Sequence, residues 1–477
     1  MIAATGSGTT HEQAGSTMTD QGLSDTTTTS ASLNWPLLLI LLPIPFEWLL
    51  VPALGYRSIM WLPVLFAVCS LVISPIRAVQ RMENFFSIAL KVNIFYLCYM
   101  GALTCATLWG ANVGDGVAEL VRAYSQLFFY VVIGTVLVGR SLNSNARTIL
   151  IAVPLSLLAF VCYCQYVFMV RGDSLTAQLM AAVSSGDSNA VAQRVIRHIV
   201  GFQFAESSPE RALEVCASVR NSISSSLLVS LLLFWALTTT LPKSQKGFWF
   251  GSSMVFVSTM VPVLLFIIMS RSNLIACLAA PLIAYAFYMF SSTGLRSRNT
   301  IVFAALVAVQ VVIAAILLYA GFSDNEFLAL NIQRMQDISS DVRLQHYHEI
   351  FDRIQQRPWL GYGLGAETPD GRKVHNLFLG GWFRAGIPGL VLSVLFYIAL
   401  AFVWVRESFS IHRQSGVVKE FPTVFWIPAL MVEPLLRTPL IGGQGGRFLR
   451  VEWLAVACFL TVCATLRQTT SRTTSLH

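Results

Sequence analysis

The chain alternates long apolar runs with short polar loops. Many of the runs are about 20 residues long, the length that an α-helix needs to cross a bilayer. Runs such as 148–170 and 301–320 are apolar on every face, whereas the strands of a membrane barrel alternate in polarity. Because a backbone in lipid must satisfy its own hydrogen bonds, these runs predict transmembrane helices.

The pattern predicts an all-α, polytopic membrane protein of about twelve transmembrane helices. The eleventh run is short enough to be re-entrant. The predicted spans are 36–54, 59–76, 92–112, 120–138, 148–170, 222–241, 248–269, 273–291, 300–320, 377–405, 421–434 and 451–466.

The composition supports a membrane protein. The chain is 55% hydrophobic and only 12% charged, whereas a water-soluble domain is about 25% charged. Its formal net charge is +8, but the basic residues are scattered over short loops. They are read as topology signals, and no nucleic-acid partner is predicted.

Lys and Arg accumulate in cytoplasmic loops, and this rule predicts the orientation. With a cytoplasmic N-terminus, every inner loop holds at least two basic residues, and both termini lie inside. The periplasm receives the loops 171–221 and 321–376 and a glycine-rich segment, 435–450. The inner basic residues are Arg77, Arg81, Lys91, Arg140, Arg147, Lys243, Lys246, Arg296, Arg298, Arg406, Arg413, Lys419, Arg467 and Arg472.

The predicted organisation begins with a disordered cytoplasmic tail, 1–34, whose Ser, Thr and Gly cannot bury enough apolar surface to fold alone. Helices 1–5 occupy 35–170, helices 6–9 occupy 222–320, and helices 10–12 occupy 377–466. Residues 467–477 form a second cytoplasmic tail.

Arginines also lie on the predicted outer side, where the topology rule does not ask for them, among them Arg271, Arg343, Arg437, Arg447 and Arg450. Positive charge at that surface is what an anionic, phosphate-bearing substrate requires.

No metal site is predicted. Eight of the nine cysteines lie in apolar runs, and only Cys216 lies in a polar loop. His346 and His348, near Glu349 and Asp352, are two residues apart and would face different sides of a helix, which disfavours a shared metal ion.

Three segments stand out in the second half of the chain. The first is Met-Ser-Arg-Ser-Asn at 269–273, which opens an apolar run. The second begins at Arg343 and ends in Arg-Pro-Trp-Leu-Gly-Tyr-Gly-Leu-Gly at 357–365. The third is the pair His375 and Asn376, followed by Arg-Ala-Gly-Ile-Pro-Gly at 384–389.

In their order and spacing, these segments resemble the O-antigen ligase and polymerase superfamily, including the lipid A core O-antigen ligases. The resemblance covers about residues 220–405. It implies a GT-C-like membrane fold in the bacterial inner membrane, with the catalytic motifs in the periplasmic 321–376 loop. It also implies inverting transfer of a glycan from undecaprenyl pyrophosphate to an acceptor hydroxyl, without a cofactor or metal.

The resemblance implies that arginines hold the pyrophosphate and that a histidine acts as base. The chemistry agrees, because Arg neutralises phosphate oxygens bidentately and histidine exchanges protons near neutral pH. His375 is the candidate base, and the alternative is that it anchors a helix at the interface. Arg271 and Arg343 are candidate phosphate ligands. The alternatives are that Arg271 is a snorkelling charge and that Arg343 is only solvated.

Three more residues are candidate substrate contacts. Asn376 could bind substrate, but a helix N-cap is the simpler interpretation. Arg220 lies at the mouth of the sixth span, and Arg447 lies in a glycine-rich loop that departs from the family pattern. The glycines at 361, 363 and 365 predict a tight turn back to the membrane rather than a phosphate loop, since no strand precedes them.

The acceptor is left open. A ligase joins the glycan to lipid A core, a polymerase extends an O-antigen or exopolysaccharide, and a protein O-oligosaccharyltransferase modifies a protein; all three would use the same donor. A transporter or lipid flippase would have similar hydropathy, but it usually carries charges near the bilayer midplane. Glu47 and Glu433 are the positions that would fit that alternative.

Overall fold

The computed structural model contains only helices among the residues it describes. The described residues are 32–43, 79–110, 112–170, 209–267, 270–291, 342–366, 376–415, 425–442 and 450–474, with the isolated positions 65, 68, 69, 177, 180, 181, 184 and 374. The predicted span 300–320 and most of the spans 36–54 and 59–76 lie outside them, as do most of the tail and of the 171–221 loop.

The helices, in chain order, are α2 (Trp35–Leu41), α6 (Val79–Leu108), α7 (Val113–Val138), α8 (Leu142–Val170), α11 (Pro209–Thr238), η2 (Lys243–Gln245), α12 (Phe248–Ile267), α13 (Arg271–Ser291), α16 (Val342–Gln356), α17 (Leu377–Ser415), η5 (Ile427–Met431), η6 (Glu433–Gly442) and α18 (Arg450–Thr474).

Six described helices are long and apolar enough to cross a membrane: Met82–Leu108, Val113–Val138, Leu142–Tyr166, Phe248–Leu265, Ser272–Phe290 and Leu377–Ile411. They overlap six of the predicted spans, although the first begins ten residues before the predicted start at 92. The predicted span 222–241 is matched by a shorter apolar helix, Ile223–Thr238. The all-helical class and several spans are thus confirmed, while the full number of twelve stays a prediction.

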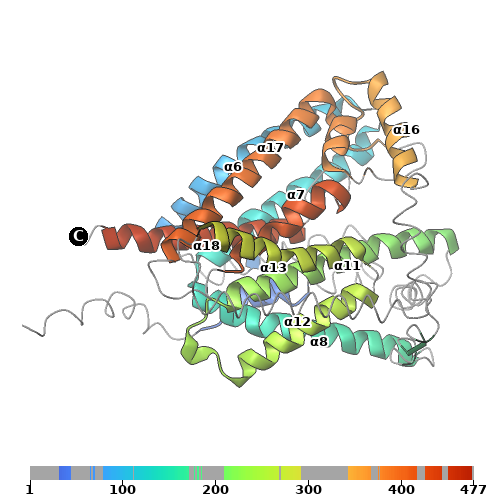
Figure 1. Cartoon of the computed structure of the whole chain (residues 1–477). Helices are drawn as coiled ribbons and strands as arrows, with labels where there is room; N and C mark the ends of the chain where they lie inside the picture. The colour runs from blue at the N-terminus through green and yellow to red at the C-terminus, as the bar shows by residue number, and fades with distance from the viewer. Residues whose placement is uncertain are drawn as a thin grey trace, which may run out of the picture.

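The helices form a bundle in which segments distant in sequence lie side by side. α17 packs along α6, and α18 packs against α7 (Figure 1). An aromatic cluster fills part of this interface: the ring of Trp453 lies 4.9 Å from that of Tyr96 and 4.7 Å from that of Tyr130. Such edge and tilted contacts add to the packing in a core where lipid provides no hydrophobic driving force.

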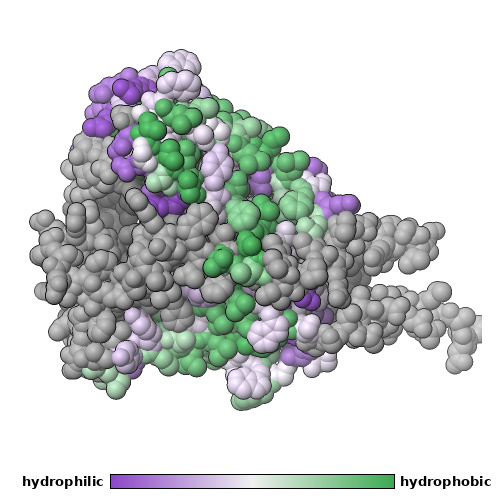
Figure 2. Space-filling view, turned by 180° about the vertical axis from the view of Figure 1, so that it is seen from behind, coloured by the Kyte–Doolittle hydropathy of each residue, from purple (hydrophilic) through white to green (hydrophobic). Residues whose placement is uncertain are grey.

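Large apolar side chains are exposed along the long helices. Ile94, Phe128, Leu158, Ile275 and Phe402 are each between 47% and 62% exposed. Figure 2 shows a broad band of hydrophobic residues across the described surface of one face, with hydrophilic residues on either side of it. This surface suits a lipid environment, since soluble monomers rarely expose so much contiguous apolar area.

Contacts join loops that the charge pattern assigns to the same side. At the predicted inner side, Asn34 Nδ2 donates to Asn145 Oδ1 at 2.7 Å, and Arg147 Nε donates to Gln245 Oε1 at 2.9 Å. At the predicted outer side, Leu364 N donates to Thr107 Oγ1 at 3.1 Å. Which of the two sides faces the cytoplasm stays a prediction.

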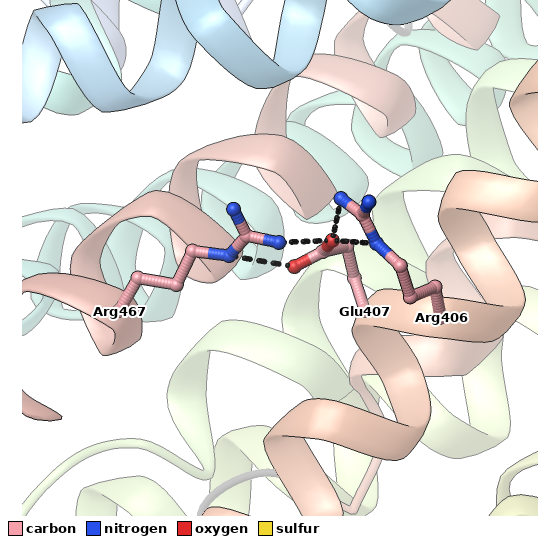
Figure 3. A network of polar contacts seen from close by, with 3 residues as sticks. All are labelled: Arg406, Glu407 and Arg467. Atoms are coloured by element: carbon pink, nitrogen blue, oxygen red, sulfur yellow. Dashed lines mark hydrogen bonds and ion pairs between the residues drawn. The ribbon is translucent and has the colours of Figure 1, made fainter.

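A charged cluster fastens α17 to α18 on the predicted inner side (Figure 3). Glu407 is 1% exposed and accepts from Arg406 Nε at 2.9 Å and from Arg467 Nε at 3.0 Å. The two arginine side chains are 39% and 37% exposed, so their charged heads reach toward water. We call these three residues the Glu407 cluster.

Several boundaries differ from the prediction. α11 begins at Pro209 rather than near 222, because its polar first turns continue the helix without a breaker, and proline is favoured in a first turn. The predicted loop 321–376 contains helix α16. The eleventh span is a short 3₁₀-helix followed by a π-helix that runs to Gly442, eight residues beyond the predicted end at 434.

Candidate functional site

The Ser-Arg-Ser-Asn motif forms a turn, residues 270–273, at the start of α13. Ser270 N donates to Leu265 O, and Leu274 N donates to Ser270 O, which joins the end of α12 to the new helix. Asn273, which is fully buried, donates from Nδ2 to Ser270 Oγ at 2.8 Å and to Ser224 Oγ at 2.7 Å. The second of these bonds fastens the 270–273 turn to α11.

This arrangement brings two candidate arginines onto adjoining elements. Arg271 is the first residue of α13, within the turn itself. Arg220 precedes Ser224 by four residues on α11, so the two share a helix face. The side chains of both arginines lie outside the described residues. Their backbone positions are nevertheless tied together by the bond between Asn273 and Ser224.

An ion pair that the sequence did not assign to the site lies beside this turn. Glu433 and Arg437 are 0% and 5% exposed and form a salt bridge within η6. Arg437 Nη1 also donates to Ser225 Oγ at 2.5 Å, and its Nε lies 3.5 Å from Ser272 Oγ. The guanidinium therefore contacts both α11 and the 270–273 turn.

Arg343 is the second residue of α16, and its side chain lies outside the described residues. The helix packs on the start of α17 through an apolar cluster of Ile350, Ile354, Val374 and Phe383. These four side chains are at most 1% exposed. The convergence of Arg343 with Arg271 on one pocket stays a prediction.

The glycine-rich loop after α16 interlocks with an interruption in α17. Tyr362 N donates to Phe383 O at 2.9 Å, and Gly363 N donates to Arg384 O at 2.8 Å. At Gly386 the backbone of α17 leaves the helical region, with φ of 65°. A Cβ at Gly386 would lie 2.1 Å from Trp359 O, so only glycine permits this approach.

This interlock confirms the tight turn predicted for the glycines, since Gly361 and Gly363 both have positive φ. The interruption of α17 was not predicted, because the 384–389 segment reads as part of one long helix. It divides α17 into a short first part, attached to α16, and a long part within the bundle.

Asn376 is the N-cap of α17. Its Oδ1 accepts from Phe378 N at 2.9 Å and from Leu379 N at 3.0 Å, and its carbonyl accepts from Gly380 N. The capping interpretation is therefore supported by geometry, and the substrate-contact interpretation stays untested. His375 lies outside the described residues, between buried Val374 and this cap. Arg447 lies outside them as well.

The histidines of α16 face different sides, as their spacing predicts: His346 is 5% exposed and His348 is exposed. Among the described residues, no group of three His, Cys, Asp or Glu side chains could hold a metal ion.

Sequence reasoning missed two features of the site. Glu433 and Arg437 were noted separately, although their spacing of four residues in an apolar segment signals a pair. Arg384 is 6% exposed at the interruption of α17. The signal available in the sequence was an arginine directly before Ala-Gly within an apolar run.

Comparison with known proteins supports the motif-based resemblance. Residues 254–394 match the family model described as O-antigen ligase. The match covers under a third of the chain and runs from the middle of α12 into α17. It contains the 270–273 turn, α16, the glycine-rich loop and His375. No curated protein matches the chain.

Proposed function

We propose that this chain, whose residues 254–394 match the family model described as O-antigen ligase, is an O-antigen ligase-like glycosyltransferase of the inner membrane. It transfers a glycan from an undecaprenyl-pyrophosphate-linked donor to a hydroxyl group of lipid A core at the periplasmic face. Members of this family are glycosyltransferase-like enzymes, which act on lipid-linked glycans and polysaccharides.

The observation that carries the proposal is the attachment of the 270–273 turn to α11. The hydrogen bond from Asn273 to Ser224 holds the backbone of Arg271 beside the helix that carries Arg220 one turn earlier. Two guanidinium groups from adjoining elements suit a pyrophosphate, which offers several anionic oxygens. Arg343 of α16 and Arg447, which follows η6 in the sequence, are proposed as further contacts to the pyrophosphate.

The proposed reaction is an inverting displacement. The acceptor oxygen attacks the anomeric carbon, the bond between that carbon and the pyrophosphate oxygen breaks, and the electron pair leaves with the lipid pyrophosphate. His375 accepts the proton of the attacking hydroxyl. The arginines stabilise the charge that develops on the leaving group, so the reaction needs no metal ion or cofactor.

The architecture around His375 supports its role. The N-cap at Asn376 and the buried packing of Val374 hold the residues on either side of it. Arg343 belongs to the same unit, since α16 and the start of α17 share one apolar cluster.

Deletion of the gene tests the biological function. The glycans of the deletion strain are separated on gels, and the lipid-linked fraction is analysed. Loss of a ligase leaves bare lipid A core and free lipid-linked polymer, whereas loss of a polymerase leaves single repeats. Loss of a protein O-oligosaccharyltransferase leaves the lipid A core and the polymer unchanged, but a protein then lacks its glycan. If every glycan is unchanged, the transferase proposal is wrong.

Purified protein separates a transferase from a transporter or flippase. The protein in detergent is mixed with lipid-linked donor, lipid A core and a chelator. A transferase forms product without any membrane barrier, whereas a transporter or flippase forms none.

A further inference from the structure

The buried pair of Glu433 and Arg437 is unusual for a membrane bundle. Both side chains are at most 5% exposed, and charges taken into such an environment are costly unless they are paired. Apolar residues of similar volume often give equal or greater stability than a buried ion pair. A role other than stability is therefore the better explanation for this pair.

The contacts of Arg437 point to that role. Its Nη1 donates to Ser225 of α11, and its Nε approaches Ser272 of the 270–273 turn. Ser272 directly follows Arg271, and Ser225 lies five residues after Arg220. One guanidinium thus bridges the two elements that carry the candidate phosphate ligands.

The element that carries Arg437 suits it for this task. η6 is a π-helix, a rare form that often occurs at functional sites. It contacts α11, α13, α17 and α18, and Tyr397 of α17 donates to Pro434 O at 3.3 Å. The position of the guanidinium is therefore fixed from several sides.

We propose that Arg437 is a positioning residue for the lipid-pyrophosphate donor. Glu433 orients the guanidinium, which fixes the 270–273 turn against α11 and so sets the spacing between Arg271 and Arg220. The inference rests on the proposed function, because it assumes that these arginines hold the donor phosphates. A planar guanidinium can serve a carboxylate and two hydroxyls at once, whereas an ammonium is a point charge.

The test must separate positioning from simple stabilisation. In the double variant Glu433→Leu with Arg437→Met, both charges are replaced by apolar side chains of similar volume, so the thermal stability should stay near that of the wild type. The contacts to Ser225 and Ser272 are lost. We expect kcat/KM for the donor to fall about tenfold to 10²-fold, the cost of a small misplacement, with the KM for the acceptor unchanged.

A second variant keeps the ion pair and removes the two serine hydroxyls that Arg437 contacts. Ser225→Ala with Ser272→Ala leaves Glu433 and Arg437 in place, and it decides the question if the first variant does not fold. We expect the same selective loss toward the donor, in a smaller amount. Glu407→Leu with Arg467→Met is the matched control, since it removes a charged pair on the predicted inner side and should leave both KM values unchanged.

The outcomes distinguish this inference from the function on which it rests. If the wild-type protein transfers glycan and the folded variants have the wild-type kcat/KM for the donor, the pair is only structural and the positioning role is wrong. An equal loss toward donor and acceptor would also contradict it. If the wild-type protein itself transfers no glycan, the proposed function fails, and the inference fails with it.

Discussion

Two charged clusters lie at different levels of the bundle. In the Glu407 cluster, a buried carboxylate is held by two arginines that are more than a third exposed. In the pair of Glu433 and Arg437, both partners are enclosed. Tyr397 contacts the residue after Glu433 and precedes Glu407 by ten residues on α17, a rise of about 15 Å.

The difference lies in what the arginines contact. Arg406 and Arg467 extend toward the surface, as arginines at the ends of spans do, and they join α17 to α18. Arg437 contacts the serine next to Arg271 in a segment that matches the O-antigen ligase family. The same pair of residue types therefore fastens helices in one place and supports a candidate substrate site in the other.

The largest effect is expected at His375. His375→Ala should lower the transfer rate by about 10² to 10⁴, the usual cost of losing a general base. Donor binding and the amount of protein in the membrane should be unchanged. Transfer and donor binding are measured on purified protein with chelator present. A transfer rate near that of the wild type would show that His375 is not the base, and His346 or His348 would be the next candidate for that role.

Arg271→Ala should weaken donor binding by about tenfold to 10²-fold, since a hydrogen bond to a charged group contributes about 1.5–3 kcal/mol. Arg406→Ala is the matched control, because it removes an arginine of the Glu407 cluster. Binding of a lipid-pyrophosphate analogue is titrated for both variants. If both variants bind the analogue equally weakly, the loss reflects the lower positive charge of the protein rather than a contact of Arg271 with the donor.

Glu407→Gln should lower the free energy of unfolding by about 1–3 kcal/mol, since the carboxylate accepts several charged hydrogen bonds. The loss should be moderate, because the partly exposed arginines can return to water. Transfer should stay at the wild-type rate. Thermal unfolding in detergent and the transfer assay are measured together, and a selective loss of transfer would show that the two clusters do not differ as described.

Asn376→Ala should have the smallest effect, about 1 kcal/mol of stability from the lost N-cap. If capping is its whole role, Asn376→Asp or Asn376→Ser restores stability and transfer together. Recovery of stability without recovery of transfer would show that the amide also contacts substrate. Thermal unfolding and the transfer rate of the three variants separate these cases.

Most of the helices can be predicted from local sequence, whereas the contacts that join distant segments at the candidate site cannot. The apolar runs at 120–138 and 273–291 predict their helices because a membrane span must satisfy its own backbone. The interruption at Gly386 depends on the approach of Trp359 O. The contact of Arg437 with Ser225 joins residues 212 positions apart. No local pattern specifies such partners.

We propose that the lipid pyrophosphate binds beside the 270–273 turn. Photocrosslinking tests this placement with a lipid-pyrophosphate analogue that carries a photoreactive group next to the phosphates. Mass spectrometry then locates the modified peptides. We expect these peptides to contain Arg220, Arg271 or Arg343, and we expect excess unlabelled donor to prevent their modification. Competable modification confined to the peptides of Arg406 and Arg467 would contradict this placement.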